Sequence, residues 1–255
     1  MKSPEESARE VFGRRARTYA TSACHTDPQV LGMVVELSGA SPEWRALDVA
    51  TGTAHTAFAL APAVASVIGM DLTPEMLGEA RHLGVQRSIS NVTFQIADVH
   101  HLPYPDGSFD LITCRRAAHH FSDIASALRE MRRALRRGGR LVIDDRSVPE
   151  DDFVDNCMNQ LDRFHDESHV RQYRPGEWRE MLEEAGFEVE SVEPYTRHRP
   201  LASLTDGVSE ANVRRVCQTL ERLDELQRRA LSLGEGDGVT HLNHWYVMIS
   251  ASASR

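Results

Sequence analysis

Three aspartates and one glycine stand at spacings that suit the binding of a nucleotide-like ligand. Asp71 lies 19 residues after Gly52, close to the spacing of about 20 residues at which an acid binds ribose hydroxyls in nucleotide-binding βαβ units. Gly52 belongs to the turn 51–54, where small side chains let a ligand approach the main chain. Asp48 stands just before this turn, and Asp98 follows a later apolar segment. Small residues also end strands for reasons of packing, so the turn alone is weak evidence for a site.

A second group of residues has types suited to proton transfer. His119 and His120 are adjacent, and a neutral imidazole accepts a proton from a hydroxyl, an amine or an acidic carbon. We therefore name both as candidate catalytic bases. The alternative is that one histidine bonds the backbone and the other is solvated. Arg115 offers a planar pair of donors that suits a carboxylate of a substrate or cofactor.

A third group resembles part of a metal site. His165 and His169 stand four residues apart, with Asp162, Asp166 and Glu167 nearby. On a helix this spacing would place both imidazoles on one face. A metal site needs a third ligand that the sequence does not identify, so we interpret the segment as a hydrated surface helix and predict no metal.

Four apolar or β-favouring runs place these groups at one edge of a sheet. The runs cover residues 45–50, 64–70, 91–97 and 108–114. Asp71 and Asp98 directly follow the second and third runs, and Arg115 follows the fourth. Because the carboxyl ends of parallel strands meet at the edge where open α/β sheets bind ligands, we expect these side chains to surround one crevice.

Helix signals between the runs complete an alternating pattern. We expect Thr51 or Thr53 to cap the helix after the turn. A later helix is expected to begin at Asp123 and to end at Gly138-Gly139. Residues 244–250 form the final strand, which we expect to be antiparallel at the end of the sheet.

Three segments together resemble the successive motifs of class I S-adenosylmethionine-dependent methyltransferases, most closely the ubiquinone/menaquinone-biosynthesis type. The segments are LDVATGTA (47–54), VIGMDLTPEML (67–77) and IADVHHLPYPDGSFDLITCRRAAHHF (96–121). The resemblance covers about residues 10–195 in order, and the combination is more specific than any of its parts. It implies S-adenosyl-L-methionine as the cofactor and S-adenosyl-L-homocysteine as the product.

The resemblance also implies positions for the cofactor. Asp48 and Gly52 would lie beside its amino-acid portion, Asp71 on its ribose and Asp98 at its adenine. Val99 and Leu72 would lie next to these acids. In the family a segment before the nucleotide fold covers the cofactor, which makes Tyr19, Ser22 and His25 candidate pocket residues. The alternative is that Tyr19 is simply packed and that the other two lie on a surface.

The turn departs from the family's acid-x-Gly-x-Gly-x-Gly pattern. Ala50 and Ala54 stand where the outer glycines are usual. Alanine is tolerated where φ is negative, so we expect negative φ at both positions.

Charge and composition limit the partners. The chain has 255 residues, 41% of them hydrophobic, and 29 basic against 38 acidic residues give a net charge of −9. This charge disfavours nucleic acids and anionic membranes as partners, and no apolar run reaches the roughly 20 residues of a membrane helix. The four cysteines, Cys24, Cys114, Cys157 and Cys217, form no C-x-x-C pair and follow no secretory leader, so we expect a reducing cytoplasm.

The whole pattern predicts one α/β methyltransferase domain over residues 1–255. We expect a Rossmann-like, doubly wound, mostly parallel seven-stranded sheet with helices on both faces. The core covers 28–147 and 174–251, with a helical cover at 1–27. Helical insertions at about 148–173 and 200–238 would form a lid and, as one alternative, a homodimer surface.

The predicted reaction is in-line methyl transfer to a small organic acceptor, because acidity and insertions over the crevice suit a closed pocket. The protein would align the acceptor and exclude water, with base help where the acceptor is protonated. Two alternatives remain. One is a nicotinamide oxidoreductase, which shares the glycine turn and the ribose acid but has a G-x-G-x-x-G run that this sequence lacks. The other is a protein that binds adenosylmethionine without transferring its methyl group.

Overall fold

The computed structural model describes residues 4–22, 25–236 and 238–254. Its centre is one sheet with the strand order β3-β2-β1-β4-β5-β8-β6, to which the short β7 is added by pairing with β8. The strands are β1 Arg45–Val49, β2 Ser66–Asp71, β3 Val92–Ile96, β4 Phe109–Arg115, β5 Leu135–Ser147, β6 Phe187–Pro200, β7 Gly234–Gly236 and β8 Val239–Ala253. Neighbouring strands from β3 to β5 are parallel, which confirms the predicted mostly parallel sheet.

The final strand is antiparallel, as predicted, but it does not lie at the end of the sheet. β8 pairs with β5 on one side and with β6 on the other, antiparallel to both. Residues 246–251 of β8 are buried, whereas the side chains of β6 after Phe187 are exposed or only partly buried. The more apolar strand therefore occupies the covered position, and the glutamate-rich β6 forms the edge.

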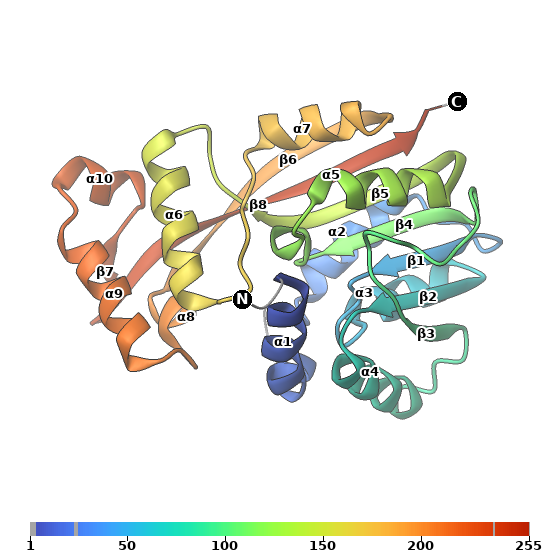
Figure 1. Ribbon diagram of the computed structural model, residues 1–255, viewed down its shortest axis with the longest axis horizontal. Helices are drawn as coiled ribbons and strands as arrows, with labels where there is room; N and C mark the ends of the chain where they lie inside the picture. The colour runs from blue at the N-terminus through green and yellow to red at the C-terminus, as the bar shows by residue number, and fades with distance from the viewer. Residues whose placement is uncertain (1–3, 23–24, 237, 255) are drawn as a thin grey trace.

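Helices cover both faces of the sheet (Figure 1). The helices are α1 Pro4–Thr21, α2 Pro28–Ser38, α3 His55–Leu60, α4 Pro74–Gln86, α5 Ile124–Ala134, α6 Asp152–His165, α7 Pro175–Glu184, α8 Ala202–Thr205, α9 Glu210–Glu221 and α10 Glu225–Ala230, with 3-10 turns η1 Ala61–Ala63 and η2 Ala118–His120. One apolar core joins the sheet to α5 and α7, and a second joins it to α2, α3 and α4. Alternate residues of β1 belong to the two cores: Leu47 packs in the first and Ala46 in the second. This alternation is expected of a strand that is covered on both faces.

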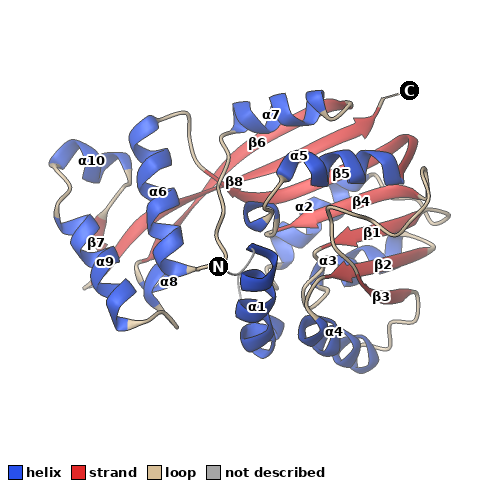
Figure 2. Ribbon diagram, in the orientation of Figure 1, coloured by secondary structure: helices blue, strands red, loops and turns tan. Residues whose placement is uncertain are grey.

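A third apolar core lies away from the parallel strands. The long strands β6 and β8 extend beyond the parallel strands, and α6, α8, α9 and α10 pack together at their far end (Figure 2). We call these four helices the helical lobe. Val216, Leu220 and Leu231 are buried there, whereas Leu226, on the short helix α10, is 76% exposed. The helices of the lobe fall within the two ranges predicted as insertions.

The prediction for the helix that begins at Asp123 is right at its start and wrong at its end. Asp123 does begin α5, where its side chain accepts a hydrogen bond from the Ser126 amide. The helix ends at Ala134, however, and not at the glycine pair. The chain enters β5 directly, and Gly138 takes a left-handed φ of 68° within that strand. There the pairing of β4 with β5 shifts register between Phe109 and Leu111, so the glycine accommodates a bulge and does not stop a helix.

The described cysteines are Cys114, Cys157 and Cys217, and all three are free thiols; Cys24 lies outside the described residues. None of the helices that the described residues form is both long and apolar enough to cross a membrane.

Candidate active site

A cavity opens at the carboxyl ends of β1, β2 and β4, with a free volume of about 990 Å³ that includes space open to solvent. All eight residues predicted to bind the cofactor line it: Tyr19, Asp48, Gly52, Asp71, Leu72, Asp98, Val99 and Arg115. We call this space the first cavity. The strand order therefore brings together Asp48 and Arg115, which stand 67 positions apart in the chain, as the placement at strand ends predicted.

Asp71 ties the end of β2 to the turn that follows β1. Its Oδ2 accepts a hydrogen bond from the Gly52 amide at 2.9 Å, and its Oδ1 accepts one from the Thr73 amide at 2.8 Å. Burial raises the pKa of this carboxyl group above its usual value, while the two backbone donors lower it. Each oxygen keeps a second lone pair, so the carboxylate is held in a fixed orientation and still has acceptor capacity toward the cavity.

The Asp48 carboxylate accepts hydrogen bonds from two hydroxyl groups. Thr113 donates to Oδ1 at 2.6 Å and Thr51 donates to Oδ2 at 2.5 Å. Asp48 is only 1% exposed, and burial raises its pKa. The prediction that Thr51 or Thr53 caps α3 is wrong: the N-cap residue is Ala54, without a side-chain cap bond, because the Thr51 hydroxyl is engaged by Asp48.

The turn itself has an unusual backbone. The φ angles of Ala50, Gly52 and Ala54 are 49°, 54° and 69°, so the prediction of negative φ at the two alanines is wrong. The Thr51 amide donates to the Met70 carbonyl and the Ala54 amide to the Thr51 carbonyl, both at 2.8 Å. These bonds hold the turn in a left-handed geometry, which is unfavourable for a residue with a Cβ atom.

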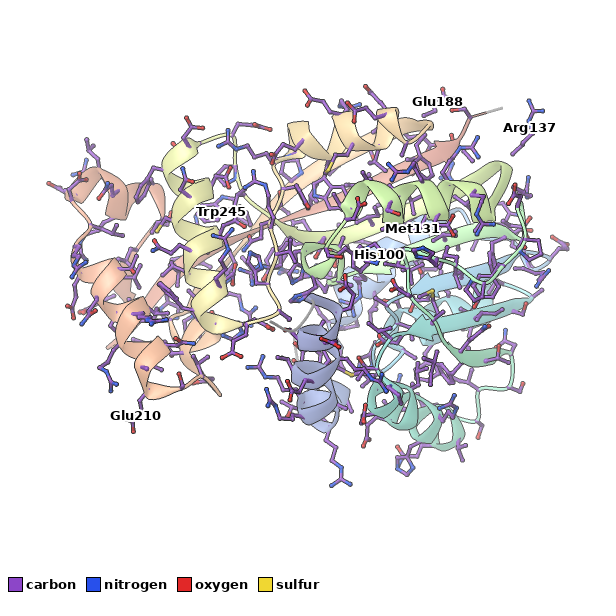
Figure 3. The ribbon with its side chains drawn as sticks, in the orientation of Figure 1. His100, Met131, Arg137, Glu188, Glu210 and Trp245 are labelled. Carbon is purple, nitrogen blue, oxygen red and sulfur yellow. The ribbon has the colours of Figure 1, made fainter. Side chains whose placement is uncertain are left out.

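Asp98 turns the chain after β3. Its Oδ1 accepts the His100 amide at 2.9 Å and lies 2.7 Å from His100 Nδ1. The Asp98 side chain is 39% exposed, so its carboxylate can still accept a hydrogen bond from a ligand in the cavity. His100 lies beside α5 (Figure 3), and its Nε2 accepts the Asp123 amide at 3.4 Å.

The N-terminal helix α1 and the loop after it cover the first cavity. Phe12 and Tyr19 line it, with ring centroids 5.8 Å apart, and the Tyr19 ring lies 4.5 Å from the ring of His25. His25 lines both this cavity and a second one, whereas Ser22 lines only the second. Burial lowers the pKa of His25 to about 3, and Arg115 and Arg116 contribute to the shift.

Arg115 brings a buried positive charge to the first cavity. Its Nε donates to Thr56 Oγ1 at 2.8 Å and its Nη2 donates to the His25 carbonyl at 2.7 Å. Its Nη1 is buried without a hydrogen-bond partner among the described residues, 4.0 Å from Asp144 Oδ2. A side chain that is 5% exposed therefore keeps one donor for a ligand acceptor.

A second cavity continues from the first toward α6 and β8. The two share Tyr19, His25, Arg116 and His120 as lining residues, which we call the junction. The second cavity has a free volume of about 1380 Å³, including space open to solvent. Most residues that line it carry polar or charged side chains, and histidines and arginines are prominent among them.

His119 is oriented by a carboxylate at the end of β5. Its Nδ1 lies 2.6 Å from Asp145 Oδ1, and its backbone amide donates to Asp145 Oδ2 at 2.9 Å. This contact places the Nδ1 proton toward Asp145 and leaves Nε2 as the acceptor. Burial lowers the pKa of His119 well below its ordinary value, with His120 and His169 adding to the shift, and burial raises the pKa of Asp145 to about 6.

The two candidate bases occupy different positions. His120 lies at the junction, with Nδ1 3.1 Å from both the carbonyl and the hydroxyl oxygen of Ser168. His119 lines the second cavity but not the first. Their ring centroids are 4.0 Å apart. His120 contacts a backbone carbonyl, as the alternative expected of one histidine, but both imidazoles are only partly exposed, so neither matches a solvated histidine.

His165 and His169 do not share a helical face. His165 is the last residue of α6, and His169 lies in the loop beyond it, with Nε2 3.0 Å from Asn159 Oδ1. Both line the second cavity, so the interpretation of a hydrated surface helix is wrong. Within residues 4–22, 25–236 and 238–254, no group of three or more His, Cys, Asp or Glu side chains is arranged to hold a metal ion.

Sequence reasoning missed several residues of the second cavity. Arg146, Arg199 and Tyr246 line it, and Asp145 lies behind His119. Arg146 lies near the carboxyl end of β5, at the same edge of the sheet as the predicted acids, so its position offered a signal. Tyr246 comes from an antiparallel strand, where no rule of strand-end placement applies.

Comparisons with known proteins give a consistent result. A family model described as a methyltransferase domain matches residues 47–143. An uncharacterised methyltransferase, YcgJ of Bacillus subtilis, is 40% identical over 171 residues, which are 67% of this chain and 68% of that protein. A demethylmenaquinone methyltransferase of Deinococcus radiodurans is 44% identical over 102 residues, 39% of this chain and 42% of that protein.

Solved structures extend the similarity to the whole fold. A putative methyltransferase of Bacillus halodurans superposes with a TM-score of 0.84 and 30% identity, over 88% of this chain and 99% of that one. The geranyl diphosphate C-methyltransferase of Streptomyces coelicolor, solved with S-adenosyl-L-homocysteine, superposes with a TM-score of 0.61 and 13% identity, over 89% of this chain and 79% of that one. At that identity the likeness concerns the fold.

Proposed function

The chain belongs to the S-adenosylmethionine-dependent methyltransferases, and from this premise we propose that it methylates a small organic acceptor bound in the second cavity. The observation that carries the proposal is the junction, because it joins the first cavity, which the candidate cofactor-binding residues line, to the second cavity. Membership of the family favours methyl transfer over nicotinamide chemistry and over binding without transfer.

The residues of the first cavity fit S-adenosyl-L-methionine. Asp71 has the acceptor capacity for ribose hydroxyls, and Asp98 with Val99 would hold the adenine. Leu72 would pack beside the ribose. The amino-acid portion would lie against Asp48 and the bare backbone at Gly52. We assign the free Nη1 donor of Arg115 to its carboxylate, because guanidinium and carboxylate form strong charge-assisted hydrogen bonds. Tyr19 would cover the cofactor from the side of α1.

When bound, the cofactor supplies a methyl group that its sulfonium centre already activates. The protein's contribution is then to align the acceptor at the junction and to exclude water. Phe12 and Tyr19 of α1 close this side of the junction, and the polar groups of the second cavity hold the acceptor from the other side.

We assign the proton acceptor to His119. Its depressed pKa keeps the imidazole neutral near pH 7, and its Nε2 is the free acceptor. Asp145 would stabilise the imidazolium that forms, as carboxylates do behind catalytic histidines. His120, at the junction, would contact the acceptor next to the transferred methyl group. A cytoplasmic location and a homodimer through the helical lobe stay predictions.

Calorimetry with S-adenosyl-L-homocysteine tests the cofactor assignment. Asp71→Asn keeps the shape of the side chain but removes its charge and replaces one acceptor oxygen with a donor, so we expect a loss of affinity of about tenfold or more, as for hydrogen bonds to charged groups. Glu188→Gln is the matched control, because Glu188 is exposed at the edge of the sheet away from α1 (Figure 3). Equal affinity in the two variants, or no affinity in the wild type, would contradict the proposal.

A further inference from the structure

Three guanidinium groups surround one phenol in the second cavity. The Cζ atoms of Arg116 and Arg146 lie 3.8 Å and 5.7 Å from the ring centroid of Tyr246. Nη1 of Arg199 donates to the Tyr246 hydroxyl at 3.3 Å. These four side chains come from the end of β4, from β5, from β6 and from β8, so only the folded sheet brings them together. We call Arg146, Arg199 and Tyr246 the arginine wall.

The field at this wall is positive. Burial by itself raises the pKa of the Tyr246 phenol, yet Arg146, Arg116 and Arg199 together bring it below its usual value. Carboxylates compensate part of this charge: Asp144 accepts from Arg116 Nε at 2.8 Å, and Asp162 accepts from Arg146 Nη2 at 2.6 Å. The wall still favours an anion over a neutral group.

Two buried polar atoms of the second cavity have no hydrogen-bond partner among the described residues. They are Arg146 Nε and His165 Nδ1. The Arg146 side chain is 13% exposed, and its Nε can only donate. Buried donors are nearly always satisfied by protein, water or ligand. A ligand oxygen at this point would satisfy the arginine donor, and with the appropriate tautomer it would also accept from the histidine.

The charge of the lining limits the charge of the ligand. Among the described residues that line the second cavity there are four arginines and three aspartates, and Asp144, which pairs with Arg116, supplies a fourth carboxylate. Asp162, Asp166 and Asp206 would repel a second negative charge. A singly charged oxyanion is therefore a better match than a phosphate dianion, and the planar guanidinium fork suits a carboxylate.

We propose that the methyl acceptor is a small monoanion whose carboxylate binds at the arginine wall, while its reacting atom lies at the junction beside His120. This inference rests on the proposed function and adds the chemical class of the acceptor. The acceptor then spans the second cavity, from the anion-binding end at Arg146 and Arg199 to the end that it shares with the first cavity. A neutral acceptor of the same shape would leave the Arg146 donor unpaired, which costs affinity.

Matched aromatic probes test this proposal in the presence of saturating S-adenosyl-L-homocysteine. Benzoate, benzamide and phenyl phosphate share a ring and differ in charge, and calorimetry or ligand-observed magnetic resonance measures their affinities. We expect benzoate to bind about tenfold or more tightly than benzamide, the factor typical of a hydrogen bond to a charged group, and also more tightly than phenyl phosphate. Arg146→Gln and Arg199→Gln should each remove most of this preference.

Arg137→Gln is the control, since Arg137 is exposed and projects away from both cavities at the edge of the molecule (Figure 3), and it should retain the preference. If Arg146→Gln does not fold, Arg199→Gln carries the test. Equal binding of benzoate and benzamide, tighter binding of phenyl phosphate, or no binding of benzoate would overturn the inference. Affinity for S-adenosyl-L-homocysteine in the same samples separates these results from a failure of the proposed function, which would abolish that affinity as well.

Discussion

The left-handed turn between β1 and α3 leads to a stability prediction that a matched pair of substitutions isolates. Ala54 and Ala57 are both 0% exposed and both lose the same methyl group on substitution by glycine. They differ in backbone: Ala54 has a φ of 69°, whereas Ala57 lies inside α3. The difference between Ala54→Gly and Ala57→Gly therefore measures the cost of placing an alanine in the left-handed region.

The magnitudes follow from three contributions to the free energy of unfolding. Removing a buried methyl group costs about 0.8 kcal/mol at either position. Glycine in a helix costs about 1 kcal/mol relative to alanine, so we expect Ala57→Gly to destabilise by about 2 kcal/mol. At position 54 the entropy cost of glycine, about 0.5–1 kcal/mol, is offset by relief of left-handed strain of about 1–2 kcal/mol. Ala54→Gly is therefore expected to be close to neutral.

Urea denaturation of the protein without ligand measures both variants, with the slope of the transition as a check that the unfolded state is unchanged. Fluorescence and circular dichroism should give coincident transitions, because the comparison assumes two states. Gly52→Ala is the reverse control: its φ is 54° and a Cβ there meets no atom within 4 Å, so a loss of stability reports the backbone alone. If Ala54→Gly destabilises as much as Ala57→Gly, the turn stores no left-handed strain and the reasoning is refuted.

Two further predictions concern the histidines. His119→Gln and Asp145→Asn should each lower turnover of an identified acceptor by about 10²–10⁴, the contribution of a general base, and the double variant should be little worse than His119→Gln, because the two residues act as a unit. Stability should also fall as the pH drops below about 6.5: burial holds the pKa of His169 at about 4, that of His55 at about 4 and that of His25 at about 3, so the unfolded state binds more protons in this range. The pKa of Asp145, raised by burial to about 6, acts in the opposite direction, because the folded state binds that proton more readily. His169→Gln should therefore reduce the acid-induced loss of stability, measured by denaturation at about pH 7 and about pH 5.

Each of these predictions has a result that contradicts it. Unchanged turnover in His119→Gln would remove the general base from the mechanism. Additive losses in the double variant would mean that Asp145 does not act through His119. For the stability prediction, His82→Gln serves as a control because His82 is exposed on α4. An equal acid sensitivity in the wild type and in His169→Gln would show that this buried imidazole does not contribute.

The sequence alone determined the parallel strands and the first cavity. Apolar runs, turn residues and the spacing of Asp71 from Gly52 are local patterns, and the geometry of parallel sheets converts them into one ligand-binding edge. Asp98 and Arg115 reached that edge for the same reason. The family resemblance then identified the cofactor that these positions suit.

Backbone angles and long-range partners could not be obtained in this way. The φ angles of Ala50 and Ala54 depend on hydrogen bonds to β2 and within the turn, and the composition of the turn alone led to the wrong sign. The partner of His119 is Asp145, which lies 26 residues away on another strand. A sequence pattern identifies His119 as a candidate base but does not show which carboxylate lies next to its imidazole.

The position and the lining of the second cavity depend on tertiary structure. Arg116, Arg146, Arg199 and Tyr246 meet only because β8 inserts antiparallel between β5 and β6. This strand order depends on whether β6 or β8 gains more stability from having a neighbouring strand on each side. The spacing of residues along one chain carries no such information. Local patterns thus indicated the residues that line the first cavity, whereas the packing of distant strands formed the second cavity and set the charge of its lining.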